Sequence, residues 1–115
     1  MMIKIEAIVR EEKLEDVKSA LSEINVNGMT VYQVMGCGIQ KGYTESVRGT
    51  KIDIALRPKI KFEIVVSSEE WEEKVIKAIQ GAACTGNVGD GKIFSYDMRS
   101  AIRIRTNETG QSSLD

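Results

Sequence analysis

Two segments of the chain share one alternation of apolar and polar residues. Ile3–Val9 reads IKIEAIV and Ile60–Val66 reads IKFEIVV, so an apolar side chain occupies every second position of both. A period of two is typical of a β-strand that buries one face. We therefore predict a strand at each segment.

Each of these segments precedes a stretch whose apolar residues recur at intervals of three and four, which is typical of a helix with one buried face. The helix-spaced residues are Leu14, Val17, Leu21 and Ile24 in the first stretch and Trp71, Val75, Ala78, Ile79 and Ala82 in the second. Ser67 and Glu70 fit the spacing of a capping box and predict the start of the second helix.

A glycine-containing turn after each helix leads into another strand-like run. Asn27-Gly28 precedes MTVYQVM, and the glycine-rich GDG precedes KIFSYDM. A β-α-β unit therefore occurs twice, which indicates the split βαβ, or ferredoxin-like, pattern. We predict an α+β fold of βαββαβ order, an antiparallel sheet with two helices on one face.

The sheet face that points away from the helices carries a repeated pair of aliphatic residues, Ile8 and Val65. Their polar neighbours on this face are Lys4, Glu6, Lys61 and Glu63. A sheet covered on one side has a second face that is either wetted or covered. Isolated surface aliphatics are common, but the repeated position favours a subunit interface or a bound ligand on this face.

The connection between the two halves, residues 36–58, is longer than an ordinary loop. Structureless connections beyond about 15 residues are usually functional or disordered. Gly36 and Gly38 match part of a dinucleotide-binding fingerprint, but Lys41 takes the place of the third glycine and no helical pattern follows. Two glycines at a strand end still allow a ligand to approach the backbone. The only proline, Pro58, ends the connection.

The segment CTGNVGDGKIF combines three glycines with an aspartate and a lysine. The spacing from Gly86 to Gly91-Lys92 matches most of a P-loop, but Ile93 replaces the magnesium-binding hydroxyl and a helix precedes the loop instead of following it. Two interpretations remain. The bare backbone and the lysine form an anion site, or the segment is a flexible turn in which Asp90-Gly91 supplies positive φ.

The segment AIRIRT places Arg103 and Arg105 on one face of an extended segment, with Ile102 and Ile104 on the other. Such a segment is either a solvated edge strand or a pair of guanidinium groups for phosphate or carboxylate. The polar tail at residues 107–115 is expected to be frayed.

Composition limits the function further. The 115 residues suit a single domain, 1–115. Sixteen basic and 17 acidic residues give a net charge of -1, which argues against nucleic acid and anionic membranes as partners. No histidine is present and the two cysteines are isolated, which argues against a zinc site and implies no disulfide framework. Without a signal peptide or an apolar run long enough to insert into a membrane, we expect a cytoplasmic protein.

Over nearly its whole length the chain resembles the PII signal-transduction proteins of nitrogen control. The resemblance rests on GMTVYQVMGCGIQKG, RPKIKFEIVV, TGNVGDGKIF and IRIRT, in this order. It implies a non-enzymatic homotrimer that binds ATP or ADP in clefts between subunits, and 2-oxoglutarate together with Mg-ATP. It also implies that a long T-loop, at about residues 37–57, contacts target proteins.

The same resemblance implies the ligand sites. For the nucleotide, Gly89, Asp90, Gly91 and Lys92 wrap the phosphates, Ile8, Thr30 and Val65 line the adenine pocket, Arg103 and Arg105 reach in from the neighbouring subunit, and Gly36, Gly38, Ile39 and Gln40 complete the set. Gln40 is implied as the magnesium ligand. For 2-oxoglutarate the implied residues are Gln40, Gly89 and Lys59, whose ammonium pairs with the distal carboxylate.

Three positions bear on regulation. Ile39 stands where many relatives have an arginine near the terminal phosphate, so the preference between ATP and ADP is left open. Ile52 replaces the tyrosine that many bacterial relatives have uridylylated, so we expect no modification there. Arg48 matches the T-loop arginine that enters the mouth of an ammonium transporter. A transporter, which would bring the protein to the membrane, or an enzyme of nitrogen metabolism is therefore the expected partner.

Two other functions are compatible with parts of the sequence. The first is a ferredoxin-like small-molecule or nucleotide-binding protein with weak ATPase activity, for which Asp90 is the one suggestive carboxylate near the expected phosphates. The second is RNA binding, which ferredoxin-like domains also perform. RNA-binding members stack bases on paired aromatics, whereas this chain has 5% aromatic residues and a net charge of -1, which argues against that function.

Overall fold

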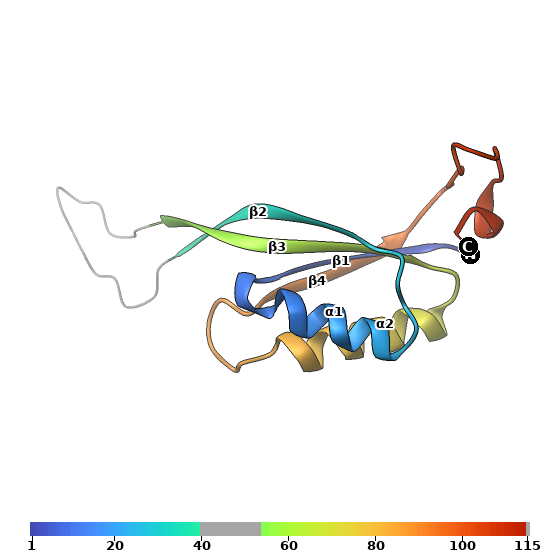
Figure 1. Ribbon diagram of the computed structural model, residues 1–115. Coiled ribbons are helices and arrows are strands. Elements are labelled where there is room, and N and C mark those ends of the chain that lie inside the picture. The colour runs from blue at the N-terminus through green and yellow to red at the C-terminus, as the bar shows by residue number, and fades with distance from the viewer. Residues whose placement is uncertain (40–53, 115) are drawn as a thin grey trace, which may run out of the picture.

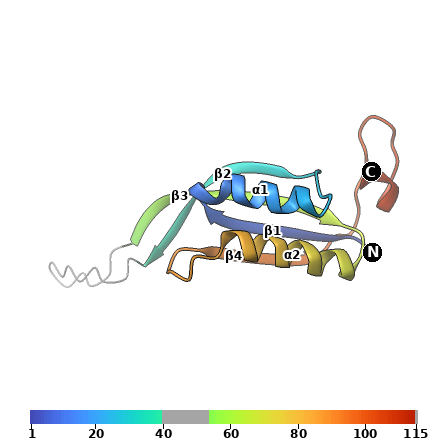
Figure 2. The ribbon, with the colours of Figure 1, turned by 60° about the horizontal axis from the view of Figure 1, so that its bottom comes forward.

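A computed structural model describes residues 1–39 and 54–114 of the chain (Figure 1). Its elements, in order, are β1 (Ile3–Arg10), a short 3-10 helix (Glu11–Lys13), α1 (Leu14–Glu23), β2 (Thr30–Ile39), β3 (Ile54–Val66), α2 (Glu69–Ala83), β4 (Gly91–Asp97) and a C-terminal 3-10 helix (Gly110–Leu114). The strands of the described part form one antiparallel sheet in the order β2-β3-β1-β4. Both helices cover the same face of it (Figures 1 and 2). The predicted ferredoxin-like fold is confirmed.

The core lies between this face and the helices, because every second residue of β1 and the matching residues of β3 are buried. The register pairs Ile5 with Ile64 and Ala7 with Phe62, so the two repeats of the sequence lie side by side in opposite directions. Burial of apolar side chains is the main favourable contribution to folding. The buried core comprises Ile3, Ile5, Ala7, Val9, Ile60, Phe62, Ile64 and Val66 from the strands and Val17, Leu21, Val75, Ile79 and Ala83 from the helices.

The other face of the sheet, called here the open face, carries a square of charges at its centre. Lys4 lies 3.3 Å from Glu63 and Lys61 lies 3.4 Å from Glu6, with longer pairs of 3.8 Å and 3.6 Å along the other two sides. The two lysines and two glutamates occupy equivalent positions of the two sequence repeats. Their charges cancel on this face.

Two tyrosines flank this square. The Tyr96 hydroxyl donates a hydrogen bond to Glu6 at 2.7 Å, and the Tyr32 hydroxyl donates one to Glu63 at 2.5 Å. These hydrogen bonds hold the pKa of each glutamate below its usual value. Both tyrosines remain more than a third exposed, as does Phe94 beside them.

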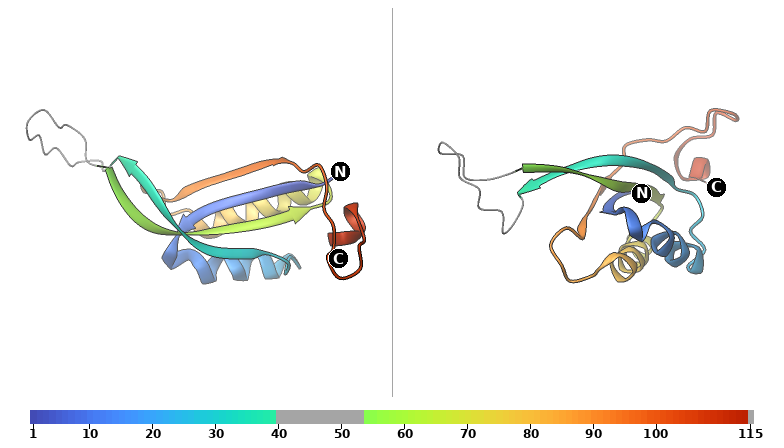
Figure 3. Two further views of the ribbon diagram at one scale, coloured as in Figure 1. Left: turned by 90° about the horizontal axis from the view of Figure 1, so that it is seen from above. Right: turned by 60° about the vertical axis from the view of Figure 1, so that its left-hand side comes forward.

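The β2–β3 ribbon is longer than the sequence predicts. β2 continues to Ile39 and β3 begins at Ile54, so strands occupy part of the segment assigned to the T-loop at 37–57. The pairing of β2 with β3 continues through Gly36 and Arg57 to Ile39 and Ile54. Pro58 fits inside β3 because β1 ends opposite the next residue, which leaves one side of β3 without a neighbour there. The ribbon extends beyond the rest of the sheet (Figure 3).

The second helix begins one residue later than the predicted capping box. Ser68 has extended backbone angles and its side chain accepts a hydrogen bond from the Trp71 N–H at 3.1 Å. Its carbonyl accepts the first helical hydrogen bond, from Glu72. Ser68 is therefore the N-cap, and the assignment to Ser67 with Glu70 is wrong.

The predicted extended segment AIRIRT is also wrong in its second half, because the chain reverses direction at residues 104–106. Ile102 pairs with Thr109 in an isolated bridge, and the Arg103 N–H donates to the Glu108 carbonyl at 2.8 Å. Asn107 takes a left-handed φ of 64°, which asparagine tolerates better than most residues. Residues 101–110 therefore form a hairpin, called here the C-terminal hairpin.

The tail that follows was expected to be frayed, but it has defined contacts as far as Leu114. It forms a 3-10 helix in which the Gln111 side chain donates to the carbonyl of Met1 at 2.7 Å and to that of Ser67 at 3.1 Å. The amide of Gln111 thus joins the tail to the N-terminus and to the end of β3.

The two serines before α2 give a matched test of the cap. Replacing Ser68 with Ala is expected to lower the free energy of unfolding by about 1 kcal/mol, because one N–H of the first turn loses its acceptor. Ser67→Ala should change it by less than about 0.5 kcal/mol. Urea denaturation followed by circular dichroism measures both. A larger loss in the Ser67 variant would contradict the assignment.

Candidate functional site

Residues 85–92, called here the glycine loop, connect the end of α2 to the start of β4. Gly86, Gly89 and Gly91 have φ values of 87°, 104° and 106°, a region that other residues rarely adopt. Gly91 has a second constraint, since a Cβ there would lie 1.8 Å from the Ile8 carbonyl oxygen. The loop can follow this path only with glycine at position 91.

The carboxylate of Asp90 points back into the loop. It accepts hydrogen bonds from the Thr85 hydroxyl, from the Thr85 N–H at 2.7 Å and from the Gly86 N–H at 2.9 Å, and Arg10 Nε lies 3.0 Å away. The Thr85 hydroxyl, helped by these other donors, holds the pKa of the Asp90 carboxyl well below its usual range. Asp90 is therefore ionised and its oxygens are occupied, which makes it a poor general base.

Two cationic side chains donate hydrogen bonds to backbone carbonyls of the loop. The Arg10 guanidinium donates to the Val88 carbonyl at 2.7 Å, and the Lys59 ammonium donates to the Gly89 carbonyl at 2.6 Å. Gly36 allows Lys59 to take this path, because the Lys59 Cγ lies 3.1 Å from where a Cβ of Gly36 would be. The sequence-predicted residues Gly36, Lys59 and Gly89 are thus brought together.

Arg10 and Thr85 are the site residues that sequence reasoning missed. Arg10 is 80 residues away from Asp90 in the chain. The strand pattern contained an indication of this contact. Arg10, next to the buried Val9, lies on the open face, and the glycine segment precedes β4, which pairs with β1. Only the register of β1 with β4 makes that signal specific.

Several hydrogen-bond donors of the glycine loop have no partner among the described residues. Among the described residues, the N–H groups of Val88 and Gly89 have no hydrogen-bond acceptor, whereas the Asp90 N–H closes a turn over Val88–Gly89, and the Lys92 ammonium has no ion-pair or hydrogen-bond partner. Lys92 pairs with Ile8 in the sheet, so both side chains lie on the open face. Unpaired N–H groups beside a lysine are suited to bind an anion.

The remaining predicted residues lie at the other end of the sheet. Val65 is four positions further along β3 than Lys61, which pairs with Ile8, a separation of roughly 13 Å. Thr30 begins β2 at that end. Val65 also lines a cavity of about 490 Å³ with the tail residues Gln111, Ser112 and Leu114.

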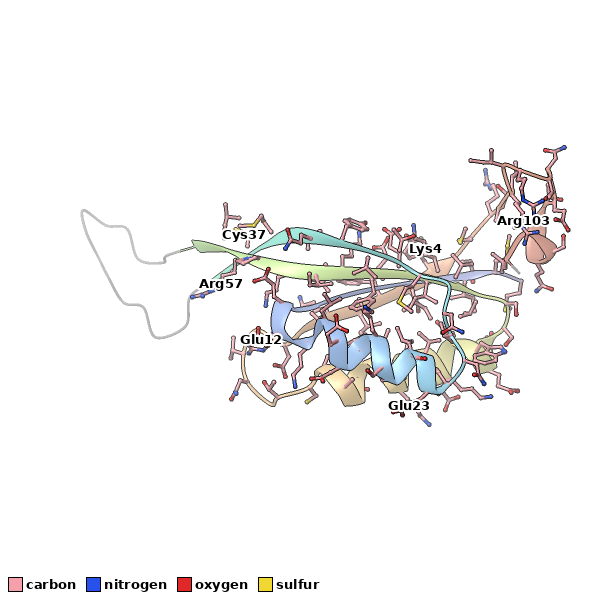
Figure 4. The ribbon with its side chains drawn as sticks, viewed as in Figure 1. Lys4, Glu12, Glu23, Cys37, Arg57 and Arg103 are labelled. Atoms are coloured by element: carbon pink, nitrogen blue, oxygen red, sulfur yellow. The ribbon has the colours of Figure 1, made fainter. Side chains whose placement is uncertain are left out.

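Arg103 and Arg105 belong to this far end too. They lie on the C-terminal hairpin, which projects beyond the sheet opposite the β2–β3 ribbon (Figures 3 and 4). In Figure 4 Arg103 is at one end of the molecule, whereas Arg57 and Cys37 are at the other. The nucleotide residues predicted from the sequence therefore form two groups in one protomer.

Some predicted positions cannot be placed in either group. Gln40, Arg48 and Ile52 lie outside the described residues. Gly38 and Ile39 are the last two residues of β2 and pair with Ala55 and Ile54 at the outer end of the ribbon, away from Lys59.

Within the described residues, no cluster of three or more metal-ligating side chains is present, and no helix is long and apolar enough to cross a membrane. The site in the described ranges therefore rests on backbone donors and on lysine and arginine side chains.

Comparison with known proteins identifies the family. A family model described as Nitrogen regulatory protein P-II matches residues 2–108. The chain belongs to the P-II family of nitrogen regulatory proteins. A P-II protein of Pasteurella multocida is 48% identical over 113 residues, covering 98% of this chain and 100% of the relative. P-II 1 of Methanothermobacter thermautotrophicus is 50% identical, covering 98% and 97%.

Solved structures agree with this assignment. A GlnK–ATP complex of B. subtilis has a TM-score of 0.83 at 40% identity and covers 98% of this chain and 97% of its own. PII of Arabidopsis thaliana bound to citrate has a TM-score of 0.77 at 38% identity and covers 97% and 91%. The family predicted from the motifs is confirmed. P-II proteins are regulators, so the prediction of a non-enzymatic protein is confirmed as well.

The two glycines at positions 81 and 91 test the loop path. Gly91→Ala is expected to cost at least about 2–3 kcal/mol of unfolding free energy, because the φ is strained and the Cβ meets the Ile8 carbonyl. Gly81→Ala lies in α2 with open space around it, and should be neutral or stabilise by up to about 1 kcal/mol. Thermal denaturation compares them; equal stabilities would contradict the loop path.

The carboxylate of Asp90 predicts a pH dependence. Its pKa is lower in the folded protein than in the unfolded chain, so its stabilisation is present above about pH 4 and is lost as the pH falls further. Asp90→Asn should therefore lower the melting temperature at pH 7, and its difference from wild type should shrink below about pH 4. Asp97→Asn, an exposed aspartate at the end of β4, is the control. A difference that stays constant down to pH 3 would contradict the role of the ionised carboxylate.

Proposed function

We propose that this protein is a nitrogen-regulatory signal transducer that binds ATP or ADP with the phosphates on the glycine loop, and that it controls target proteins through the T-loop between β2 and β3. The observation that carries the proposal is the arrangement of the loop. Its carboxylate and two carbonyls are occupied internally, whereas the N–H groups of Val88 and Gly89 and the ammonium of Lys92 are left for an anion. The GlnK–ATP complex of B. subtilis supports adenine nucleotide as that anion.

The nucleotide site is completed by a second copy of the chain, within the homotrimer expected from the resemblance. Two observations support this. Arg103 and Arg105 are on the C-terminal hairpin, at the other end of the molecule from the β2–β3 ribbon and too far from the glycine loop of their own protomer to share one nucleotide with it. The protomer also exposes large apolar side chains that association would cover: Tyr32, Phe94 and Tyr96 on the open face, and Ile104, 97% exposed, on the C-terminal hairpin.

The second ligand is 2-oxoglutarate, bound with Mg-ATP. Lys59 and Gly89, which are in contact, would lie beside it, and Lys59 offers the cation that a small dicarboxylate needs. The citrate complex of the Arabidopsis relative supports a carboxylate ligand in this family. Magnesium would be held by Gln40 and the phosphates. The target, an ammonium transporter or an enzyme of nitrogen metabolism in the cytoplasm, would be contacted through Arg48.

Titration calorimetry with ATP and ADP tests the proposal. Wild type is expected to bind with a Kd in the micromolar range or tighter, and Lys92→Ala to bind roughly 10- to 100-fold more weakly, because a charge-assisted contact to phosphate is lost. Lys18→Ala, an exposed lysine on α1, is the control and should bind like wild type. No binding heat from wild type with either nucleotide would refute the proposal.

Mixed oligomers test whether the site is shared. Lys92→Ala and Arg103→Ala protomers, each weak alone, are co-expressed with different tags and purified together. Every mixed trimer has one interface of the three that combines an intact Lys92 with an intact Arg103, so tight sites should reappear at about one third of the interfaces. If the mixture binds no better than its components, both residues do not act on one shared nucleotide.

A further inference from the structure

The C-terminal hairpin is held by both backbone and side-chain contacts. Besides the Ile102–Thr109 bridge, the Gly110 N–H donates to the Ala101 carbonyl at 3.0 Å and the Asn107 N–H donates to the Arg103 carbonyl at 2.8 Å. The base of the hairpin is joined to the sheet, because Gln111 donates to carbonyls of the N-terminus and of the end of β3. The unit therefore has a defined shape before any ligand or second copy is present.

The carboxylate of Glu108 links the base of this hairpin to its turn. Glu108 Oε1 accepts hydrogen bonds from Arg103 Nη1 at 2.8 Å and from the Thr106 hydroxyl at 2.7 Å. Arg103 Nη2 also lies 3.4 Å from the Ser112 carbonyl. The Arg103 side chain is 23% exposed and the Glu108 side chain 43%, so the arginine is the more protected partner of this ion pair. Glu108 thus contacts both the arginine at the base of the hairpin and a residue of its turn.

We infer that Glu108 is a positioning residue that fixes the Arg103 guanidinium for a phosphate ligand held by a second copy of the chain. This inference rests on the proposed function. A long arginine side chain that is ordered in advance loses less conformational entropy when it binds. Because the carboxylate also holds the turn, it restrains the backbone that carries Arg105.

An opposite effect has to be weighed. A carboxylate beside Arg103 lowers the positive potential that attracts a phosphate, and by itself it would weaken binding. Two features make positioning the larger effect. A guanidinium has five N–H donors, so a pair with one carboxylate does not block contact with a phosphate. Arg105, exposed in the turn, supplies a second positive charge whose placement depends on the same hairpin.

A graded pair of variants decides between these effects. Calorimetry with ATP is expected to give binding about tenfold weaker for Glu108→Ala, because both hydrogen bonds are lost. Glu108→Gln keeps an acceptor oxygen and should lose only about threefold. Glu73→Ala, which removes an exposed ion pair with Lys77 on α2, should stay within about twofold of wild type. Unchanged or tighter binding of the Glu108 variants overturns the inference.

Two further readouts separate positioning from a general loss of structure. Adenosine, which has no phosphate, should bind to wild type and to the Glu108 variants with the same affinity. If the variants lose as much affinity for adenosine as for ATP, the inference is overturned. The side-chain ¹⁵N resonances of Arg103, in protein without ligand, should report an ordered guanidinium in wild type and a mobile one in Glu108→Ala. This second measurement stays informative if wild type binds no nucleotide, which would refute the proposed function alone.

Discussion

The inward orientation of the Asp90 carboxylate is the interaction on which the site depends. A carboxylate that faced outward beside three glycines would repel an anion. Here its charge is offset by Arg10, and its oxygens accept hydrogen bonds from the Thr85 hydroxyl and from the N–H groups of Thr85 and Gly86. In this conformation the N–H groups of Val88 and Gly89 have no acceptor among the described residues. The same contacts that stabilise the loop therefore leave donors that are suited to an anion.

The register of the sheet explains why one protomer holds two partial sites. The two sequence repeats pair in opposite directions, so the glycine loop and the C-terminal hairpin are at opposite ends of β1. Between them lies the square of Lys4, Glu6, Lys61 and Glu63, whose charges cancel. A second copy that covered this square would desolvate charges that are already paired, which costs less than burying unpaired charges. Under the proposed function, assembly would bring the two ends of the sheet, from different copies, to one nucleotide.

Local patterns predicted most of the fold, and contacts between distant residues account for the failures. The period of two found β1 and β3 and the helical spacing found both helices, because one buried face imposes each pattern. β2 and β4, which have no buried face, were predicted only as strand-like runs after glycine-containing turns. The choice between Ser67 and Ser68 as cap depends on backbone angles that two adjacent serines do not encode. In AIRIRT the alternation favoured a strand, but the chain turns back at residues 104–106, and Arg103 then pairs with Glu108, five residues further on. Arg10 and Asp90 meet only because β1 pairs with β4, which no local pattern specifies.

The contacts of Lys59 connect the loop to the ribbon that carries the T-loop. Lys59 lies where β1 ends and the β2–β3 ribbon continues alone, and its ammonium donates to the Gly89 carbonyl. Under the proposed function, a carboxylate ligand would compete for this ammonium while a phosphate occupies the adjacent N–H groups. A ligand shifts an equilibrium only through different affinity for two states. Lys59 would meet that condition if the carboxylate replaced Gly89 as its partner at the base of the ribbon. Ligand binding would then be converted into a change at the ribbon without a catalytic group.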